Sequence, residues 1–122
     1  MPDHRPHHRS QDMDRCIDNC QECHETCLAL VDHCLTKGGR HAEAAHIRLL
    51  LDCAQICQTS ADFMIRGSDL HTETCRACSE VCERCADDCA RMADDQAMKD
   101  CVDVCRRCAE SCRQMAGVGV AR

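Results

Sequence analysis

The spacing of cysteine constrains this chain more than any other feature of its sequence. Sixteen of the 122 residues are Cys, and within each cluster the next Cys follows after three or four residues, with one step of seven. Side chains three and four residues apart share one face of an α-helix, and this step lies near the 3.5-residue period of a helical-bundle seam. The pattern therefore predicts helices that turn stripes of thiols towards a common axis. The candidate metal ligands are Cys16, Cys20, Cys23, Cys27, Cys34, Cys53, Cys57, Cys75, Cys78, Cys82, Cys85, Cys89, Cys101, Cys105, Cys108 and Cys112.

Four helices account for these stripes. They are expected over about residues 12–36, 40–66, 68–93 and 94–116. Gly follows the first, second and fourth, and Ser or Asp stands before the third and fourth, as is typical of helix ends and helix caps. We predict an all-α fold over residues 12–122, an antiparallel up-down-up-down four-helix bundle with a Cys-lined core. Residues 1–11 are expected to form a disordered His/Arg-rich arm.

The start of the chain bears on the cellular compartment. Arg5 and Arg9 are not adjacent, no apolar run follows them, and no segment approaches the roughly 20 apolar residues of a membrane span. We therefore expect a cytoplasmic protein with reduced thiols and no membrane partner. The formal net charge of −6, with acids and bases interspersed, also argues against a nucleic-acid partner.

The thiols are too numerous for an ordinary core and poorly spaced for disulfides. The chain has one Phe and no Trp or Tyr, and each Cys in place of a larger apolar residue gives up burial worth about 25 cal/mol per Å². Helical neighbours have Cβ atoms about 5–6 Å apart, whereas a disulfide needs about 3.8 Å. Disulfides between helices remain geometrically possible, but a reducing cytosol argues against them, so metal binding is the better interpretation.

The pairing of the thiols favours Cu(I). Thiolates select Cu(I), Zn(II) or iron–sulfur clusters, and two sulfurs one helical turn apart suit an ion that accepts two or three ligands. One Cu(I) per thiolate also leaves the filled core neutral, and this predicts roughly 16 Cu(I) per chain. An iron–sulfur redox or electron-transfer protein and a zinc or heavy-metal buffer remain the alternatives. The C-x₃-C pairs are Cys16/Cys20, Cys23/Cys27, Cys53/Cys57, Cys78/Cys82, Cys85/Cys89, Cys101/Cys105 and Cys108/Cys112.

Through these in-helix pairs and the Cys stripes of all four helices, residues 12–116 resemble the bacterial four-helix-bundle copper storage proteins, and in particular their cytosolic branch. The resemblance implies that Cys residues store Cu(I) inside each bundle and that the bundles assemble as a tetramer. Exported relatives carry a twin-arginine signal, which this sequence lacks.

Four residues are candidate accessory ligands. His46 and Met98 extend the Cys stripes, and they are expected at the same end of an antiparallel bundle as His41. The resemblance implies that Met or His near the start of the second helix lines the open end, which favours the end with His41 and His46. Asn19 lies among three Cys, where an amide oxygen could cap a cluster.

Partners and activity follow from the same features. The second helix is apolar on most of its surface, so we expect it to pack against other subunits in a homotetramer. Copper would arrive from a copper chaperone or a small thiol. No nucleophile–base–orienter set is present in the sequence, so we expect no enzymatic activity.

Overall fold

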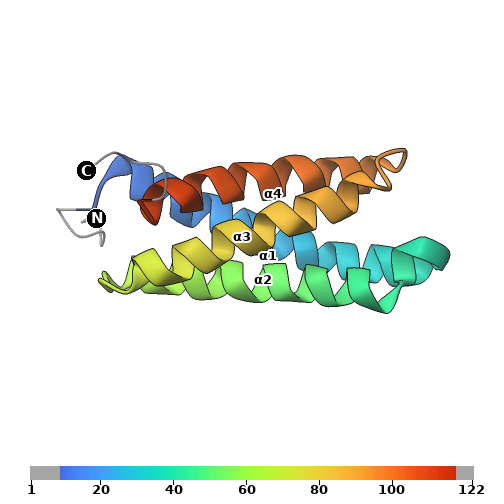
Figure 1. Ribbon diagram of the computed structural model, residues 1–122, viewed down its shortest axis with the longest axis horizontal. Coiled ribbons are helices and arrows are strands. Elements are labelled where there is room, and N and C mark those ends of the chain that lie inside the picture. The colour runs from blue at the N-terminus through green and yellow to red at the C-terminus, as the bar shows by residue number, and fades with distance from the viewer. Residues whose placement is uncertain (1–8, 118–122) are drawn as a thin grey trace, which may run out of the picture.

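A computed structural model of the protein describes residues 9–117. Four α-helices run antiparallel along one long axis (Figure 1). They are α1 (Gln11–Lys37), α2 (Ala44–Ile65), α3 (His71–Ala90) and α4 (Gln96–Met115), and a short 3₁₀ helix, η1 (Gly39–Ala42), lies between α1 and α2. The predicted all-α up-down-up-down bundle is confirmed.

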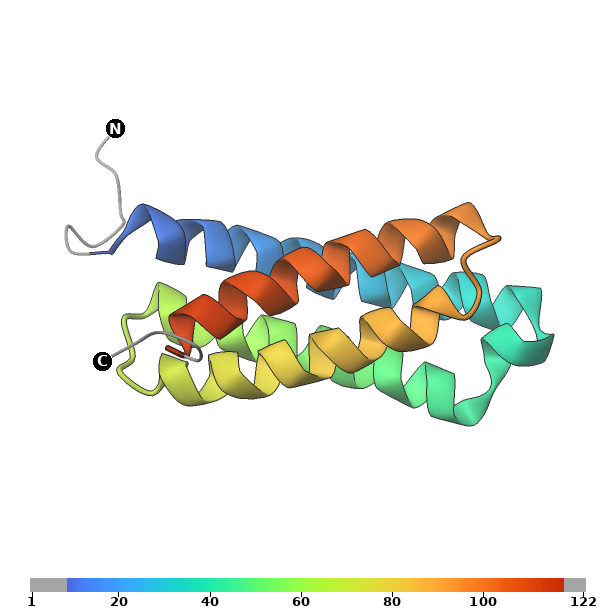
Figure 2. The ribbon, with the colours of Figure 1, turned by 45° about the horizontal axis from the view of Figure 1, so that its top comes forward.

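Each helix packs against two neighbours, with α1 between α2 and α4, and α3 likewise between α2 and α4. The α1–α2 and α3–α4 connections lie at one end of the bundle, and the α2–α3 turn lies at the other, as two views show (Figures 1 and 2). We call these ends the His46 end and the Met64 end, after the buried α2 residues nearest to each. Buried side chains from all four helices fill one central core, whose Cys-lined interior we call the lumen.

Side-chain caps decide two of the helix starts. Ser10 Oγ accepts a hydrogen bond from the Met13 backbone N–H at 3.1 Å, so α1 begins at Gln11. Asp95 accepts from the Ala97 N–H at 3.0 Å and caps α4. Because a capping residue needs extended backbone, the chain must leave α3 before Asp95. The third helix itself ends at Ala90, before the expected end near residue 93, and residues 91–94 form a turn that leads to Asp95.

The second helix also begins later than expected. Gly38 and Gly39 both have positive φ, of 75° and 58°, which turns the chain sharply after α1. Residues 40–42 belong to η1, and Glu43 is extended before α2 starts. Of the arm expected over residues 1–11, residues 1–8 lie outside the described part of the chain.

The core is made largely of small side chains. All sixteen Cys are 0–1 % exposed. The larger fully buried side chains are Leu50, Met64, Met92, Met98 and His46. A core with so few large apolar groups gains less from burial than one built on Leu and Phe. Within residues 9–117 none of the helices combines the length and the apolar character that a bilayer span requires.

Candidate metal centre

The thiols form a continuous file along the bundle axis. All sixteen are free, and successive Sγ atoms lie 3.5–4.0 Å apart from near one end of the lumen to near the other. The thiols joined by these contacts are Cys16, Cys20, Cys23, Cys27, Cys53, Cys57, Cys78, Cys82, Cys89, Cys101, Cys105, Cys108 and Cys112.

Within the file, sulfurs gather in overlapping groups of four. In each group the four Sγ atoms lie within 4.8 Å of one another, which is close enough for several thiolates to share one ion. Cys85 joins the file through such a group with Cys27, Cys101 and Cys105. Because one thiol belongs to more than one group, an ion in one position would share ligands with the next.

Contacts between helices dominate this arrangement. Two of the C-x₃-C pairs have Sγ atoms in contact, Cys78/Cys82 and Cys101/Cys105, both at 3.7 Å. The shortest contact, at 3.5 Å, joins Cys20 of α1 to Cys112 of α4, and an equally short one joins α2 to α3. The in-helix pairs are therefore halves of sites that a second or third helix completes.

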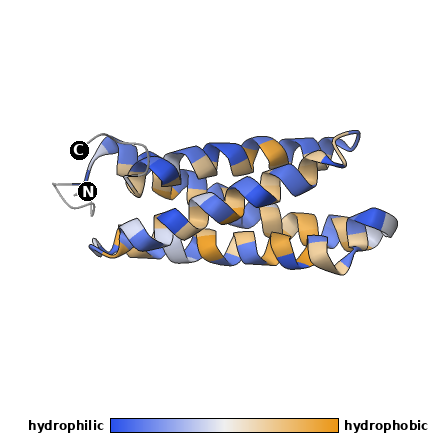
Figure 3. Ribbon diagram, viewed as in Figure 1, coloured by the Kyte–Doolittle hydropathy of each residue, from blue (hydrophilic) through white to orange (hydrophobic). Residues whose placement is uncertain are grey.

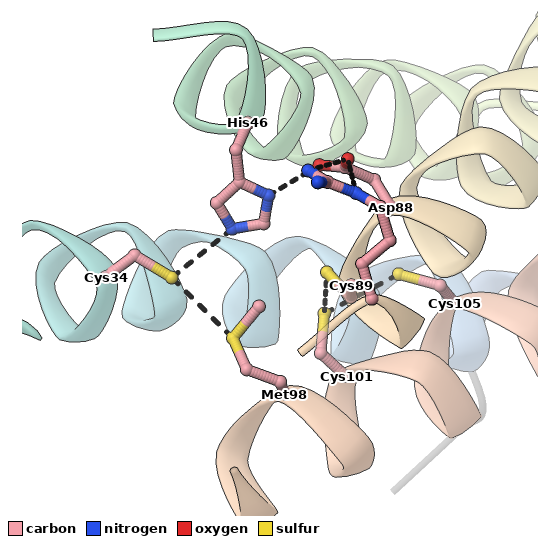
Figure 4. A network of polar contacts seen from close by, with 8 residues as sticks. Cys34, His46, Asp88, Cys89, Met98, Cys101 and Cys105 are labelled. Atoms are coloured by element: carbon pink, nitrogen blue, oxygen red, sulfur yellow. Dashed lines mark hydrogen bonds and ion pairs between the residues drawn. The ribbon is translucent and has the colours of Figure 1, made fainter. Parts of the chain in front are cut away.

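Cys34 stands apart from the file at the His46 end (Figure 4). Its Sγ lies 3.3 Å from His46 Nε2 and 3.6 Å from the Met98 Sδ. A thiol from α1, an imidazole from α2 and a thioether from α4 thus converge, and all three side chains are almost fully buried. These are donors that soft ions accept.

Asp88 orients the His46 ring. Asp88 Oδ2 lies 2.5 Å from His46 Nδ1, and Asp88 also accepts hydrogen bonds from Arg91. Although burial raises the pKa of Asp88, the hydrogen bonds from His46 and Arg91 outweigh it and lower that pKa. An ionised carboxylate at Nδ1 favours the proton there, which leaves the Nε2 lone pair facing the Cys34 sulfur.

Sequence reasoning did not find Asp88. An acid that follows another acid near a helix end looks like a surface residue, because its partner is 42 residues away in the chain. Only the packing of α2 against α3 brings the two together. No signal in the sequence marks this carboxylate.

The other candidate accessory ligands lie outside the sulfur file. His41 is on η1, with Nε2 3.2 Å from Asp95 Oδ2. The Asn19 amide donates from Nδ2 to Ser111 Oγ at 3.1 Å and so links α1 to α4. Neither contact reaches a sulfur.

The Met64 end closes the file differently. Cys75 lies 3.8 Å from the Met64 Sδ and 3.3 Å from Ser60 Oγ. Met64 is fully buried and packs against this last thiol. Both ends therefore offer a thioether, but the Met64 end adds a hydroxyl and the His46 end adds an imidazole.

Burial and mutual contact control how the thiols titrate. Burial raises the pKa of Cys34 to about 11, and the negative charge of Asp95 acts in the same direction. Hydrogen bonding to Cys108 and Cys112, with burial, raises the pKa of Cys20. Contact with Cys105 instead lowers the pKa of Cys23, so the thiols titrate as interacting groups. A bound metal must replace the protons that the thiols with raised pKa, such as Cys20 and Cys34, hold at neutral pH.

A helical bundle whose interior is a file of thiols is a metal-sequestering protein, because it buries more soft donors than a single structural or catalytic ion needs. Comparison with known proteins agrees. The sequence profile described as copper storage protein matches residues 9–117. This chain belongs to the copper storage protein family.

Solved structures show the same fold at substantial identity. A crystal structure of a protein from Nitrosospira multiformis has a TM-score of 0.83 and 46 % identity, covering 88 % of this chain and 97 % of that one. The Cu(I)-bound copper storage protein BsCsp3 has a TM-score of 0.80 and 33 % identity, covering 87 % and 99 %. A cytosolic copper storage protein from Streptomyces lividans, with five coppers, has a TM-score of 0.76 and 30 % identity, covering 91 % and 96 %. No curated protein sequence matches.

Proposed function

We propose that this protein stores Cu(I) in the cytoplasm, with about one ion for each of its sixteen Cys and no catalytic role. The observation that carries the proposal is the burial of every thiol in one lumen, with Sγ atoms in contact at 3.5–4.0 Å. Thiolates prefer Cu(I) over harder ions. The Cu(I)-bound and cytosolic relatives support both the ion and the compartment.

Charge favours Cu(I) over Zn(II). Filling the lumen with one Cu(I) per thiolate gives no net charge, whereas Zn(II) in a four-thiolate group leaves two uncompensated negative charges. Burying such charge without a partner costs several kcal/mol or more. The four-thiol groups still offer zinc a tetrahedral set, so the test must compare the two ions.

Anaerobic titration of the reduced protein with Cu(I), against a chromophoric chelator, tests the store directly. We expect a plateau at about 16 Cu(I) per chain, following the count of Cys. Zn(II) added in equal amount should not lower this plateau. A plateau at about four or fewer would show discrete sites and contradict a store.

The same titration measures proton release. Near pH 7 the thiols are mostly protonated, so we expect about one proton for each Cu(I) bound. Because the pKa of Cys34 is about 11, its proton is released on binding at every pH below that value. Apparent Cu(I) affinity at Cys34 should therefore rise about tenfold per pH unit up to pH 11. An affinity that does not change with pH would exclude protonated thiols as the resting state.

We further propose that Cu(I) enters at the His46 end, delivered by a copper chaperone or a small thiol. The mixed donors of Cys34, His46 and Met98 stand at this end, and Figure 4 shows them beside Cys89 and Cys101 of the sulfur file. Exchange between donors of similar softness would let an ion pass inward stepwise.

We also propose that the bundles form a homotetramer through α2. This helix shows more hydrophobic colour than its neighbours (Figure 3), and it exposes Leu51 at 45 % and Ile65 at 43 %. Arg48 and Asp52 are exposed beside Leu51, so the apolar surface of α2 is narrower than its sequence predicts. An exposed apolar strip rimmed by polar residues is typical of a subunit interface.

Leu51→Glu should disrupt this tetramer. A charge placed in an apolar interface loses its hydration without gaining a partner, so we expect monomers or dimers at micromolar concentration. Analytical ultracentrifugation of wild type and variant measures the change. Leu70→Glu is the matched control, since Leu70 is 62 % exposed and lies outside α2. An unchanged sedimentation coefficient in Leu51→Glu would contradict an interface at this residue.

A further inference from the structure

A second group of metal-type donors lies at the His46 end, outside the thiol lumen. His33 Nε2 from α1 lies 2.8 Å from Asp95 Oδ2, and His41 Nε2 from η1 lies 3.2 Å from the same oxygen. The two imidazole rings are edge to face, with centroids 6.2 Å apart. Three side chains from three separate segments thus bring two imidazole nitrogens to one carboxylate oxygen.

The His33, His41 and Asp95 group is largely shielded from solvent and carries the negative charge that a cation site needs. The Asp95 side chain is 8 % exposed and that of His41 is 13 % exposed, while His33 reaches solvent at 36 %. The hydrogen bond from His33, followed by that from Lys37, holds the pKa of Asp95 well below its usual range. Asp95 therefore presents a negative charge at neutral pH.

One ring nitrogen of His41 makes no hydrogen bond within the described part of the chain. This Nε2 atom is buried and has no hydrogen-bond partner among residues 9–117, although Asp95 lies near it. A buried polar atom without a partner costs about 1–3 kcal/mol. An ion held between this nitrogen, His33 and Asp95 would satisfy it.

The separations suit a first-row divalent ion. With Zn–N and Zn–O bonds of about 2.0–2.2 Å, neighbouring ligand atoms in a tetrahedron lie roughly 3.3–3.5 Å apart. The contacts of 2.8 and 3.2 Å need only a small adjustment to reach this spacing. Two imidazoles and one carboxylate leave a fourth position for water, as in open zinc sites.

Lys37 is the group that an ion would displace. Its Nζ lies 3.1 Å from Asp95 Oδ2, and its side chain is 50 % exposed. A flexible, half-exposed ammonium can move into solvent at little cost. Without an ion, Lys37 supplies the positive charge at this place.

We propose that His33, His41 and Asp95 bind one borderline divalent cation of the Zn(II) type, at a site separate from the Cu(I) store. The donors contain no sulfur, and imidazole with carboxylate suits Zn(II) better than Cu(I). A bound ion would tie the end of α1, η1 and the start of α4 together beside the Cys34 cluster. The proposal does not depend on how many Cu(I) ions the lumen holds.

The experiment uses the full chain with its thiols already filled by Cu(I), so that they do not compete for zinc. Zn(II) is then added anaerobically in an isothermal titration. We expect one Zn(II) per chain, and at least tenfold weaker binding in both His33→Ala/His41→Ala and Asp95→Asn. Asn keeps an oxygen to accept the Ala97 N–H, so this second variant preserves the α4 cap while removing the charge.

The arm histidines provide the matched control. A His4→Ala/His7→Ala/His8→Ala variant removes three imidazoles, one more than the site variant, at positions outside the described part of the chain, and should keep the wild-type affinity. Cu(I) capacity and helicity by circular dichroism check that each variant folds. Wild-type protein that binds no Zn(II), binding that survives in both site variants, or binding that is lost with the arm histidines would each overturn the proposal.

Discussion

Loading with Cu(I) is expected to raise the thermal unfolding midpoint of the reduced protein by about 20 °C or more. A ligand that binds the folded state at 1,000 times its dissociation constant stabilises that state by about 4 kcal/mol per site. For a domain of this size, each kcal/mol raises the midpoint by roughly 2–8 °C. Copper also binds Cys in the unfolded chain, and this reduces the stabilisation. Several filled sites are still enough to reach this shift in the midpoint.

The rise in the unfolding midpoint is large because the core of the apoprotein contributes little to its stability. Its lumen is lined by thiols where most bundles place Leu, and apart from Leu50 its larger fully buried side chains are Met and His. Copper replaces weak thiol contacts with metal–sulfur bonds that cross-link all four helices. The melt is followed by circular dichroism after addition of 0, 4, 8 and about 16 equivalents of Cu(I), a range set by one ion per thiolate.

The change of the unfolding midpoint with each addition of Cu(I) is as informative as the total rise. The midpoint should rise with each addition, since the overlapping groups share ligands along the whole bundle. Zn(II) at the same equivalents is the comparison and should stabilise less. A midpoint that stays within a few degrees across the series would show that copper binds outside the lumen.

Leu50→Ala is expected to destabilise the apoprotein by about 2–5 kcal/mol, because it removes a fully buried aliphatic side chain and leaves a cavity. Leu50 occupies the inner face of α2 between His46 and Cys53, where the stripe has no thiol. That loss is a large part of the roughly 5–15 kcal/mol that stabilises an ordinary domain.

Urea unfolding of the anaerobic apoprotein measures this loss. Leu70→Ala is the control: Leu70 is 62 % exposed, so its change should stay within about 0.5 kcal/mol. Cu(I) capacity should be unchanged in Leu50→Ala, because no ligand is removed. A loss below about 1 kcal/mol would mean that the lumen collapses around the site at little cost.

Much of the fold could be predicted from local spacing. Steps of three and four residues place Cys16, Cys20, Cys23 and Cys27 on one helical face, whatever lies opposite them. The same reasoning put His46 and Met98 at one end of the lumen, and the structure brings both to Cys34. Helix ends were less predictable, since a turn over residues 91–94 ends α3 early and the turn at Gly38 and Gly39 delays the start of α2.

The candidate site could be predicted only in part. The sequence predicts which thiols share a helix face but not which thiols meet across the lumen, and contacts such as Cys16 to Cys112 join residues 96 positions apart. In the sequence Asp88 looks like a surface acid, and Asp95 looks like no more than a helix cap. Packing makes the first a partner of His46 and the second a partner of His33.

By itself, then, the sequence determined that the chain is helical, that its stripes carry thiols, and that soft metal ions suit them, because helical periodicity and ligand chemistry are local properties. The tertiary structure alone decided how the sulfurs are grouped, how the His46 ring is oriented, and where His33, His41 and Asp95 meet. Those outcomes depend on the relative rotation and height of packed helices, which no spacing within a single helix encodes.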